Sequence, residues 1–308
     1  MPRALLTLLL ISVLLTPVSG LAQLPSFMVA EETENLGDGL YAYRQNAYRS
    51  IFLVTDDGVI ATDPVSVKYA RDYRAAIAAV TDQPVRYVVY SQSQWDRTRG
   101  GQIFKDEGAV FVTHEKCLEN MLDVPNPDVV MPEITYSDHY EIELGGRALE
   151  LHYFGPAHDD CLSVMVAKPA NVVFVTNVVN PPDATVPWNP TIPNNYPHNY
   201  INFFKSVEAL TEREDIERLA GGFMSIGIGP DRKPMVNPAT GPVSVLKDQR
   251  LFWELVIAEV KAALDAGVPP KQLSKKIDLE KFKSYPGYTR RGMDTVFRRI
   301  ASLQITGR

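Results

Sequence analysis

The sequence predicts an α/β protein in which helices cover the outer face of a sheet, with a helical region at the C-terminus. Runs of β-branched and aromatic residues at 50–54 and 86–90 flank a segment, 65–80, whose apolar residues recur at helical spacing. A glycine pair at 145–146 separates two further strand-like runs, and a long amphipathic pattern covers 243–266. Alternation of this kind packs helices against the face of a sheet.

Turn residues divide the chain into further elements. Gly267 follows the long amphipathic pattern and suits the C-cap of a helix. Residues 178–198, which include Trp188, form a Pro/Asn-rich loop long enough to serve as a functional rim or lid. We predict strands at 37–43, 50–54, 59–63, 86–90, 109–113, 135–144, 147–154, 162–166 and 172–176, and a short strand or turn at 220–228. Helices are predicted at 65–80, 114–121, 200–210, 243–266 and 290–303.

Composition excludes some classes of function. The chain has 308 residues, 45% of them hydrophobic, with a formal net charge of −6 and a pI near 5.5. These values are typical of a globular protein, and they leave no basic surface for nucleic acid. We expect a single domain at 23–308, with a core at about 35–245 and C-terminal helices at 243–308.

Residues 1–22 have the features of a signal peptide. Arg3 precedes an apolar run from Ala4 to Leu15, and Gly20 and Ala22 provide a small-x-small cleavage site. The alternative, a membrane anchor, needs about 20 apolar residues, and the run is shorter. We therefore expect export to a periplasm or out of the cell, with no membrane span in the mature chain.

Two cysteines, Cys117 and Cys161, leave two alternatives open. In an oxidising compartment they could form a disulfide. Two separate buried thiols fit the sequence equally well, because free cysteine is often buried.

The segment 87–101 carries the densest group of polar residues next to a predicted strand. After Tyr90 the chain reads Ser-Gln-Ser-Gln-Trp-Asp-Arg-Thr-Arg-Gly-Gly, which places Gln92, Gln94, Asp96 and Arg97 on one loop. Polar residues on a loop that leaves a buried strand are a common way to present a functional site.

This loop resembles the His-x-His-x-Asp-His motif of the metallo-β-lactamase superfamily, with Gln92, Gln94 and Arg97 in the places of the three histidines. The order of motifs over roughly residues 35–245 is also similar to that family, so the resemblance implies an αββα sandwich with a C-terminal helical extension. It further implies that Asp63 supports the site, that His158 in Gly-Pro-Ala-His is a ligand of the first metal, and that Asn177 replaces an aspartate bridging two metals. The last histidine ligand would fall at Phe223, Ile228 or Thr240, and none of these is histidine.

These substitutions argue against a binuclear zinc centre. Zinc binds imidazole, thiolate or carboxylate, and an amide oxygen is a weak donor. Arg97 keeps its positive charge at any relevant pH, and its repulsion of a dication amounts to about several kcal/mol at an effective dielectric of ~20. Only Asp96 and His158 remain as candidate metal ligands. We therefore expect no cofactor, a single weakly held zinc ion being the alternative. An ion pair of Asp96 with Arg97 or Arg99 could hold the loop instead.

Three functional hypotheses follow. The first is an exported pseudoenzyme that binds a small polar or anionic molecule, or a periplasmic protein partner, in a cleft lined by Gln92, Gln94, Asp96, Arg97, His158 and Asn177. The second is a hydrolase of an ester, thioester or lactone with one weak metal or none, in which His158 and Asp96 act. There, His158 with Asp159 or Asp160 would serve as a general base, and His198 of the rim loop could approach. The third is a periplasmic assembly component recognised through its C-terminal helices.

Overall fold

The computed structural model describes residues 31–187 and 196–307. The signal peptide predicted at 1–22 lies outside the described residues, as does the part of the predicted rim loop that contains Trp188. Within the described ranges, no helix combines the length and the apolar character needed to cross a membrane.

A seven-stranded sheet forms the N-terminal half, with its strands in chain order. The first four strands are antiparallel, and the pairs from β4 to β7 are parallel. Its members are β1 (Glu31–Gly37), β2 (Leu40–Gln45), β3 (Tyr48–Thr55), β4 (Gly58–Thr62), β5 (Val85–Val89), β6 (Val110–His114) and β7 (Ile134–Tyr136).

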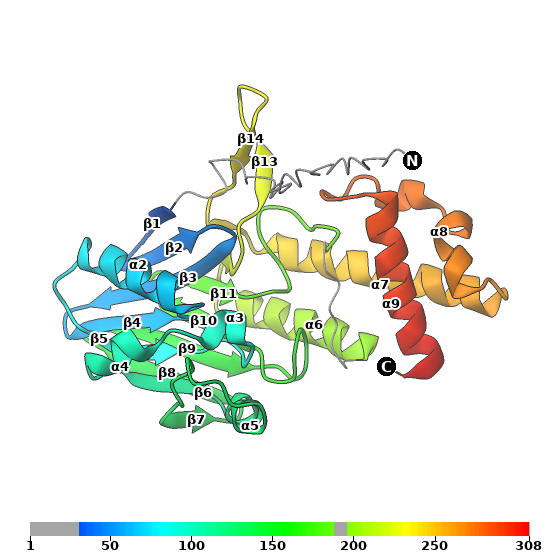
Figure 1. The fold of residues 1–308 in the computed structure, drawn as a ribbon. Coiled ribbons are helices and arrows are strands. Elements are labelled where there is room, and N and C mark those ends of the chain that lie inside the picture. Colours follow the sequence, from blue (N-terminus) through cyan, green and yellow to red (C-terminus); the bar gives the residue numbers. More distant parts are fainter. Residues whose placement is uncertain (1–30, 188–195, 308) are drawn as a thin grey trace, which may run out of the picture.

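A six-stranded sheet, in the order β15-β12-β11-β10-β9-β8, faces the first. Its strands are β8 (His139–Leu144), β9 (Arg147–Tyr153), β10 (Ser163–Lys168), β11 (Val172–Val175), β12 (Arg218–Gly221) and β15 (Thr240–Pro242). A separate hairpin of β13 (Ile226–Ile228) and β14 (Pro234–Val236) projects away from both sheets (Figure 1).

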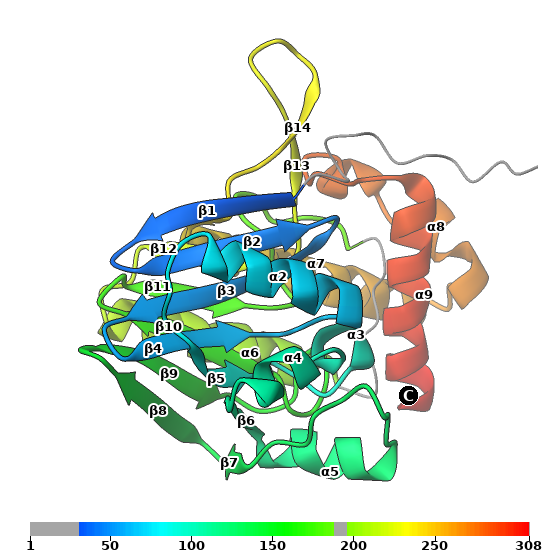
Figure 2. The ribbon, with the colours of Figure 1, turned by 60° about the vertical axis from the view of Figure 1, so that its left-hand side comes forward.

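Helices cover the outer faces of both sheets (Figures 1 and 2). The first sheet carries α2 (Val67–Ala78), α3 (Trp95–Thr98), α4 (Gln102–Asp106) and α5 (Glu115–Asp123). The second is covered by α6 (Pro197–Arg213) and α7 (Ser244–Asp265), and beyond them lie η1 (Pro270–Gln272), α8 (Leu273–Lys276), η2 (Leu279–Phe282) and α9 (Arg290–Thr306).

Three apolar clusters match these layers. One joins the first sheet to α2 and includes Tyr73 and Phe104. A second fills the space between the sheets and includes Leu151 and Phe174. The third runs from the second sheet through α6 and α7 to α9. The layers are helix, sheet, sheet, helix, so the predicted αββα sandwich with C-terminal helices is confirmed.

Two local predictions were wrong. The single strand predicted at 135–144 is divided between β7 and β8, which belong to different sheets. The segment 231–242, for which no strand was predicted, contains β14 and β15. Both errors concern strands of three residues, whose pairing depends on distant partners rather than on a local pattern.

Candidate functional site

The candidate site lies where strands of both sheets end at the same edge. Parallel strands bring their carboxyl ends together, so Asp63 after β4 lies beside the Ser91–Gln94 loop after β5. In the second sheet, the parallel strands β11 and β12 end next to each other at Asn177 and Gly222. The loop between β9 and β10 adds His158 from the same side.

Hydrogen bonds link the two sheets through Gln92, Asn177 and Arg97. The Nδ2 of Asn177 donates to Oε1 of Gln92 at 3.1 Å. The Nη2 of Arg97 donates to Oδ1 of Asn177 at 3.2 Å. Three residues that the sequence assigned to one cleft therefore form one chain of hydrogen bonds.

The guanidinium of Arg97 is completely buried. Its Nη1 donates to the carbonyl of Arg49 at 3.1 Å, and its Nη2 donates to the carbonyl of Gly222 at 2.9 Å. The rings of Tyr48 and Phe223 lie against it, with Cζ at 5.2 Å and 4.4 Å from their centroids. Its Nε lacks a hydrogen-bond partner and is also buried. Arg97 is thus a structural cation enclosed by backbone carbonyls and aromatic faces.

Gly222 makes this arrangement possible because a side chain would not fit there. A Cβ at this position would come within 2.9 Å of Nη2 of Arg97 and 2.7 Å of the Thr176 side chain. No local pattern around Gly222 predicted this requirement.

Asp96 does not pair with either arginine, contrary to the ion pair proposed from the sequence. The described residues contain no ion pair of Asp96 with Arg97 or Arg99, and Arg99 donates from Nε to the carbonyl of Trp95. Instead the hydroxyl of Tyr48 donates to Oδ2 of Asp96 at 3.1 Å. The carboxylate is half-buried and faces the mouth of the cleft.

His158 sits at the inner wall of the cleft and contacts Gln94. Its Nε2 lies 3.4 Å from Oε1 of Gln94. Burial lowers the pKa of His158 to about 4; the carboxylate of Asp96 acts to raise it and the charge of Arg97 to lower it. The ring is therefore neutral at neutral pH.

A disulfide fixes the loop that carries His158. Cys117 on α5 is bonded to Cys161, which resolves the alternative that the sequence left open. Within this loop Asp159 is buried and accepts a hydrogen bond from the backbone N–H of Cys161. Burial raises the pKa of Asp159 to about 7. The exposed Asp160 accepts from Asn120 of α5 and does not complete a base with His158.

Asp63 supports the loop after β5 from below. Its Oδ1 accepts the backbone N–H of Ser91 at 2.8 Å, and its backbone has a positive φ of 38°. Burial raises the pKa of this carboxyl to about 6, against the opposing charge of Arg97. This position agrees with the supporting role that the resemblance implied.

Of the three positions considered for the missing histidine, only Phe223 reaches the site. Its ring packs on Arg97 and Tyr48. Ile228 lies on the projecting β13–β14 hairpin and is 71% exposed. Thr240 belongs to β15 and pairs with Ala220 at the edge of the second sheet.

The donor set does not fit a binuclear zinc centre. Asn177 uses both atoms of its amide on Gln92 and Arg97, and the Nε2 of Gln92 is a buried donor without a partner. Donor groups and a fixed guanidinium repel a dication rather than ligate it. Asp96 and His158 retain ligand side chains, but they face Tyr48 and Gln94.

A pocket of about 560 Å³ opens at the mouth of the cleft. Its walls are Ser93, Gln94, Trp95 and Asp96 from the loop and α3, and Asn120, Asp123 and Val124 from α5 and its end. The described residues that line it include two carboxylates and no cation. Among the predicted cleft residues, Gln94 and Asp96 line this pocket, whereas Gln92, Arg97, His158 and Asn177 do not.

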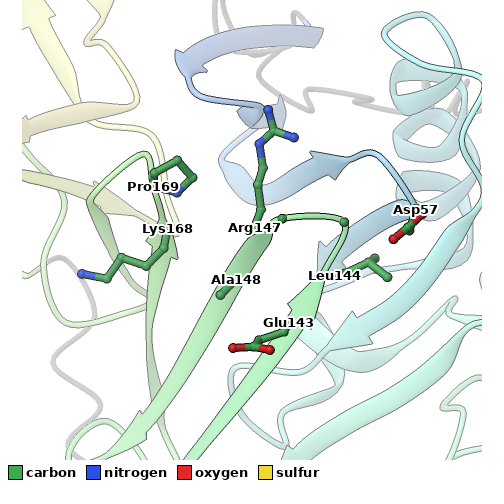
Figure 3. Close-up of a pocket in the computed structure, with 9 residues that line it drawn as sticks. Asp57, Glu143, Leu144, Arg147, Ala148, Lys168 and Pro169 are labelled. Atoms are coloured by element: carbon green, nitrogen blue, oxygen red, sulfur yellow. The ribbon is translucent and has the colours of Figure 1, made fainter.

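A second pocket, of about 610 Å³, lies at the other ends of the strands that carry the candidate site. Figure 3 shows the residues that line it. It is formed by the turns next to Asp57, Gly145 and Pro169. Its two cationic side chains have partners: Arg147 donates to the carbonyl of Asp38, and Lys168 pairs with Glu214. We assign it no function.

Sequence reasoning missed Tyr48 and Arg49. Arg49 is buried like Arg97 and donates to the carbonyls of Gly221 and Phe223; burial lowers its pKa to about 10. A charged residue inside the β-branched run that starts β3 was the available signal. Its partners lie more than 170 residues away, so the signal could not be interpreted locally.

The chain has the metallo-β-lactamase fold. It is similar in structure to a metallo-β-lactamase from Pontibacter korlensis, with a TM-score of 0.58 and 14% identity over 73% of this chain and 99% of the other. The DIM-1 metallo-β-lactamase gives a TM-score of 0.57 and 12% identity over 73% and 97% of the two chains. In sequence comparisons, no protein-family model and no curated protein matches.

The sec-alkylsulfatase Pisa1 from Pseudomonas sp. is similar over a longer stretch. Its TM-score is 0.66 at 12% identity, and the match covers 89% of this chain. About 34 residues of this chain remain outside the match. The region from Ser244 onward has 65 residues, so even if all the unmatched residues were there, part of the C-terminal helices would be matched. This chain covers 50% of the alkylsulfatase, about half the length of that protein.

Proposed function

We propose that this protein is a pseudoenzyme of the metallo-β-lactamase fold that binds a small polar molecule at its cleft without a metal ion. One observation carries the proposal: the guanidinium of Arg97 is enclosed beside Asn177 and Phe223, at the end of the cleft where the fold resemblance implies a second metal. A charge already bound to two backbone carbonyls and an amide oxygen supplies the cross-link between sheets that a metal would supply.

The mouth pocket favours a neutral or cationic ligand over an anionic one. The anion hypothesis relied on Arg97, whose Nη1 and Nη2 donate to protein oxygens and whose Nε is buried. Asp96 and Asp123 instead give the pocket negative charge, while the exposed Trp95 offers an apolar face. Cations stack well on such rings.

Export is also part of the proposal. The predicted signal peptide and the Cys117–Cys161 disulfide support it, because disulfides persist in oxidising compartments. A periplasmic or extracellular location follows, where a small molecule or a protein partner would reach the cleft.

Metal content of variants tests the loss of the metal centre. Any ion held in the cleft must use His158 or Asp96, the two remaining ligand side chains. We expect His158→Gln and Asp96→Asn to leave the metal content of the purified protein unchanged in elemental analysis. Loss of an equivalent of zinc or iron in either variant would contradict the proposal and favour the hydrolase alternative, as would ester, thioester or lactone hydrolysis that His158→Gln abolishes.

Ligand binding is tested by a thermal-shift screen with matched neutral, cationic and anionic small molecules. Binding to the folded state alone raises the melting temperature by mass action. We expect stabilisation by neutral or cationic compounds, and its loss in Asp96→Asn. Stabilisation confined to anions would refute the assignment of the pocket.

A further inference from the structure

The structure assigns a second, separate metal site to His139, Glu150 and His152, on the outer face of the second sheet, with zinc as the fitting ion. His139 begins β8 and lies directly opposite His152 of β9 in the antiparallel register. Glu150 precedes His152 by two residues, so both side chains leave β9 on the same face. One atom from each of the three residues lies within 4.8 Å of the others.

This group faces away from the cleft. Leu149 and Leu151 of β9 point into the core between the sheets, so the alternate residues Glu150 and His152 point to the side covered by α6. Their charged neighbours come from that side too: Glu214 and Arg213 end α6, and Lys168 ends β10.

The side chains are already arranged close together. The rings of His139 and His152 have centroids 4.8 Å apart, and Nε2 of His152 lies 3.3 Å from Oε2 of Glu150. Tetrahedral zinc with bonds of 2.0–2.1 Å needs its ligand atoms roughly 3.3 Å apart. The ligand atoms, now within 4.8 Å of one another, must therefore move closer together. Small rotations of the exposed His139 side chain bring them to this distance without movement of the strands.

The donor set selects a transition metal. Two imidazoles and one carboxylate are the ligand types that zinc uses, whereas calcium and magnesium prefer oxygen alone. Three protein ligands leave one position for water.

Local charge also favours a cation. Glu214 lies near Glu150, and Glu141 stands opposite Glu150 in the register. Lys168 and Arg213 both pair with Glu214, at 2.9 Å and 3.1 Å. Together with Glu141 and Glu150 this makes three carboxylates against two cations, so the net local charge is negative. A dication would relieve the repulsion between the remaining carboxylates.

The expected role is to join an edge strand to its neighbour. Among the described residues β8 is the last strand of its sheet and pairs with β9 (Figure 2). A metal bridge from the first residue of β8 to β9 would hold this edge strand in register. Edge strands need such support because their outer backbone groups are unpaired and can pair with other chains.

Zinc and cobalt(II) titrations of the mature chain, with any histidine tag removed, test the site. We expect one equivalent of zinc by calorimetry, a rise in melting temperature, and cobalt(II) absorption bands typical of tetrahedral coordination. His139→Ala should weaken binding roughly tenfold or more, comparable with the losses seen when metal sites are altered. His139 is exposed, so this variant is expected to fold.

Two control variants locate the ion. His198→Ala removes another exposed histidine, and His158→Gln removes the imidazole of the cleft; both should bind zinc as the wild type does. Failure to bind zinc, unchanged binding in His139→Ala, or loss of binding in His158→Gln would each overturn the inference.

Discussion

The guanidinium of Arg97 lies over the ring of Phe223, with 4.4 Å between Cζ and the ring centroid. The first residue comes from α3, which follows β5, and the second from the turn after β12, so the contact joins the two sheets. In the resemblance Arg97 takes the place of a metal ligand, and Phe223 is one of the three positions considered for another. A cation–π contact and hydrogen bonds to carbonyl groups thus connect the segments that a metal centre would otherwise connect.

Replacing Arg97 should destabilise the fold. In Arg97→Ala, three acceptors lose their donor and a cavity opens between Tyr48 and Phe223. Unsatisfied buried groups and a cavity together cost about 3 kcal/mol or more of the free energy of unfolding, measurable by urea denaturation.

The neighbouring arginine provides the control. Arg99 is only half-buried and donates to a carbonyl within its own turn. Arg99→Ala should cost less than about 1 kcal/mol. Equal losses in the two variants would show that Arg97 has no special structural role.

Histidine at two positions should create one metal site in the cleft. Gln92→His with Gln94→His would surround the ring of His158, since Gln94 already contacts His158 and both glutamines share one loop. We expect the double variant to bind one more equivalent of zinc than the wild type, as measured by calorimetry.

Adding His158→Gln to that variant should remove the extra equivalent. Adding Arg97→His instead should tighten zinc binding, because a fixed positive charge next to the ion is then lost. If the double variant gains no metal, the alignment of this loop with the family motif is incorrect.

The disulfide should contribute strongly to stability. It closes a loop with a sequence separation of 44 residues, for which chain entropy gives about 4 kcal/mol. Cys117→Ala with Cys161→Ala should therefore lower the denaturation midpoint, and reduction of the wild type should do the same.

Changes in the NMR signals of His158 should accompany that loss, since the bonded Cys161 lies three residues after it. A double variant as stable as the oxidised wild type would mean that packing alone holds the loop.

Acid should remove a stabilising contribution of His158. Its pKa is about 4 in the folded protein and 6.5 as the ordinary value, so between these limits the unfolded chain binds more protons. The contribution of the neutral ring to the free energy of unfolding is fully present above pH 6.5. It is lost as the pH falls towards 4, and the total loss is up to about 3 kcal/mol. The difference in unfolding free energy between wild type and His158→Gln should shrink over this range.

The comparison with the variant is necessary because other groups act in the opposite direction. Asp63 and Asp159 have raised pKa values of about 6 and 7, so they favour the folded state as the pH falls. His198→Gln, which removes an exposed ring, should follow the wild-type profile. A difference for His158→Gln that does not vary with pH would exclude a buried neutral ring.

Much of the architecture could be predicted from local patterns. Periodicity located α2, α7 and α9 within a few residues, and the Gly145-Gly146 turn joins β8 and β9 as expected. Short strands such as β7 and β14 were missed, because three residues carry too little periodicity to be recognised.

The candidate site was predicted as a set of residues but not as an arrangement. Gln92, Arg97 and Asn177 are linked by hydrogen bonds, and His158 contacts Gln94. Arg97, however, was expected to face a ligand, and it is enclosed instead. The direction of a long side chain depends on carbonyl groups that Arg49 and Gly222 bring from other strands.

The sequence by itself determined which chemical groups are present: amides, a guanidinium and an asparagine where the fold resemblance implies metal ligands. That information suffices to argue against two zinc ions, because ligand chemistry depends on residue type. Only the tertiary structure decided which of these groups are accessible. Burial, the partners of Arg97 and the disulfide all depend on residues far apart in the chain, whose contacts arise only when the two sheets and their helices pack together.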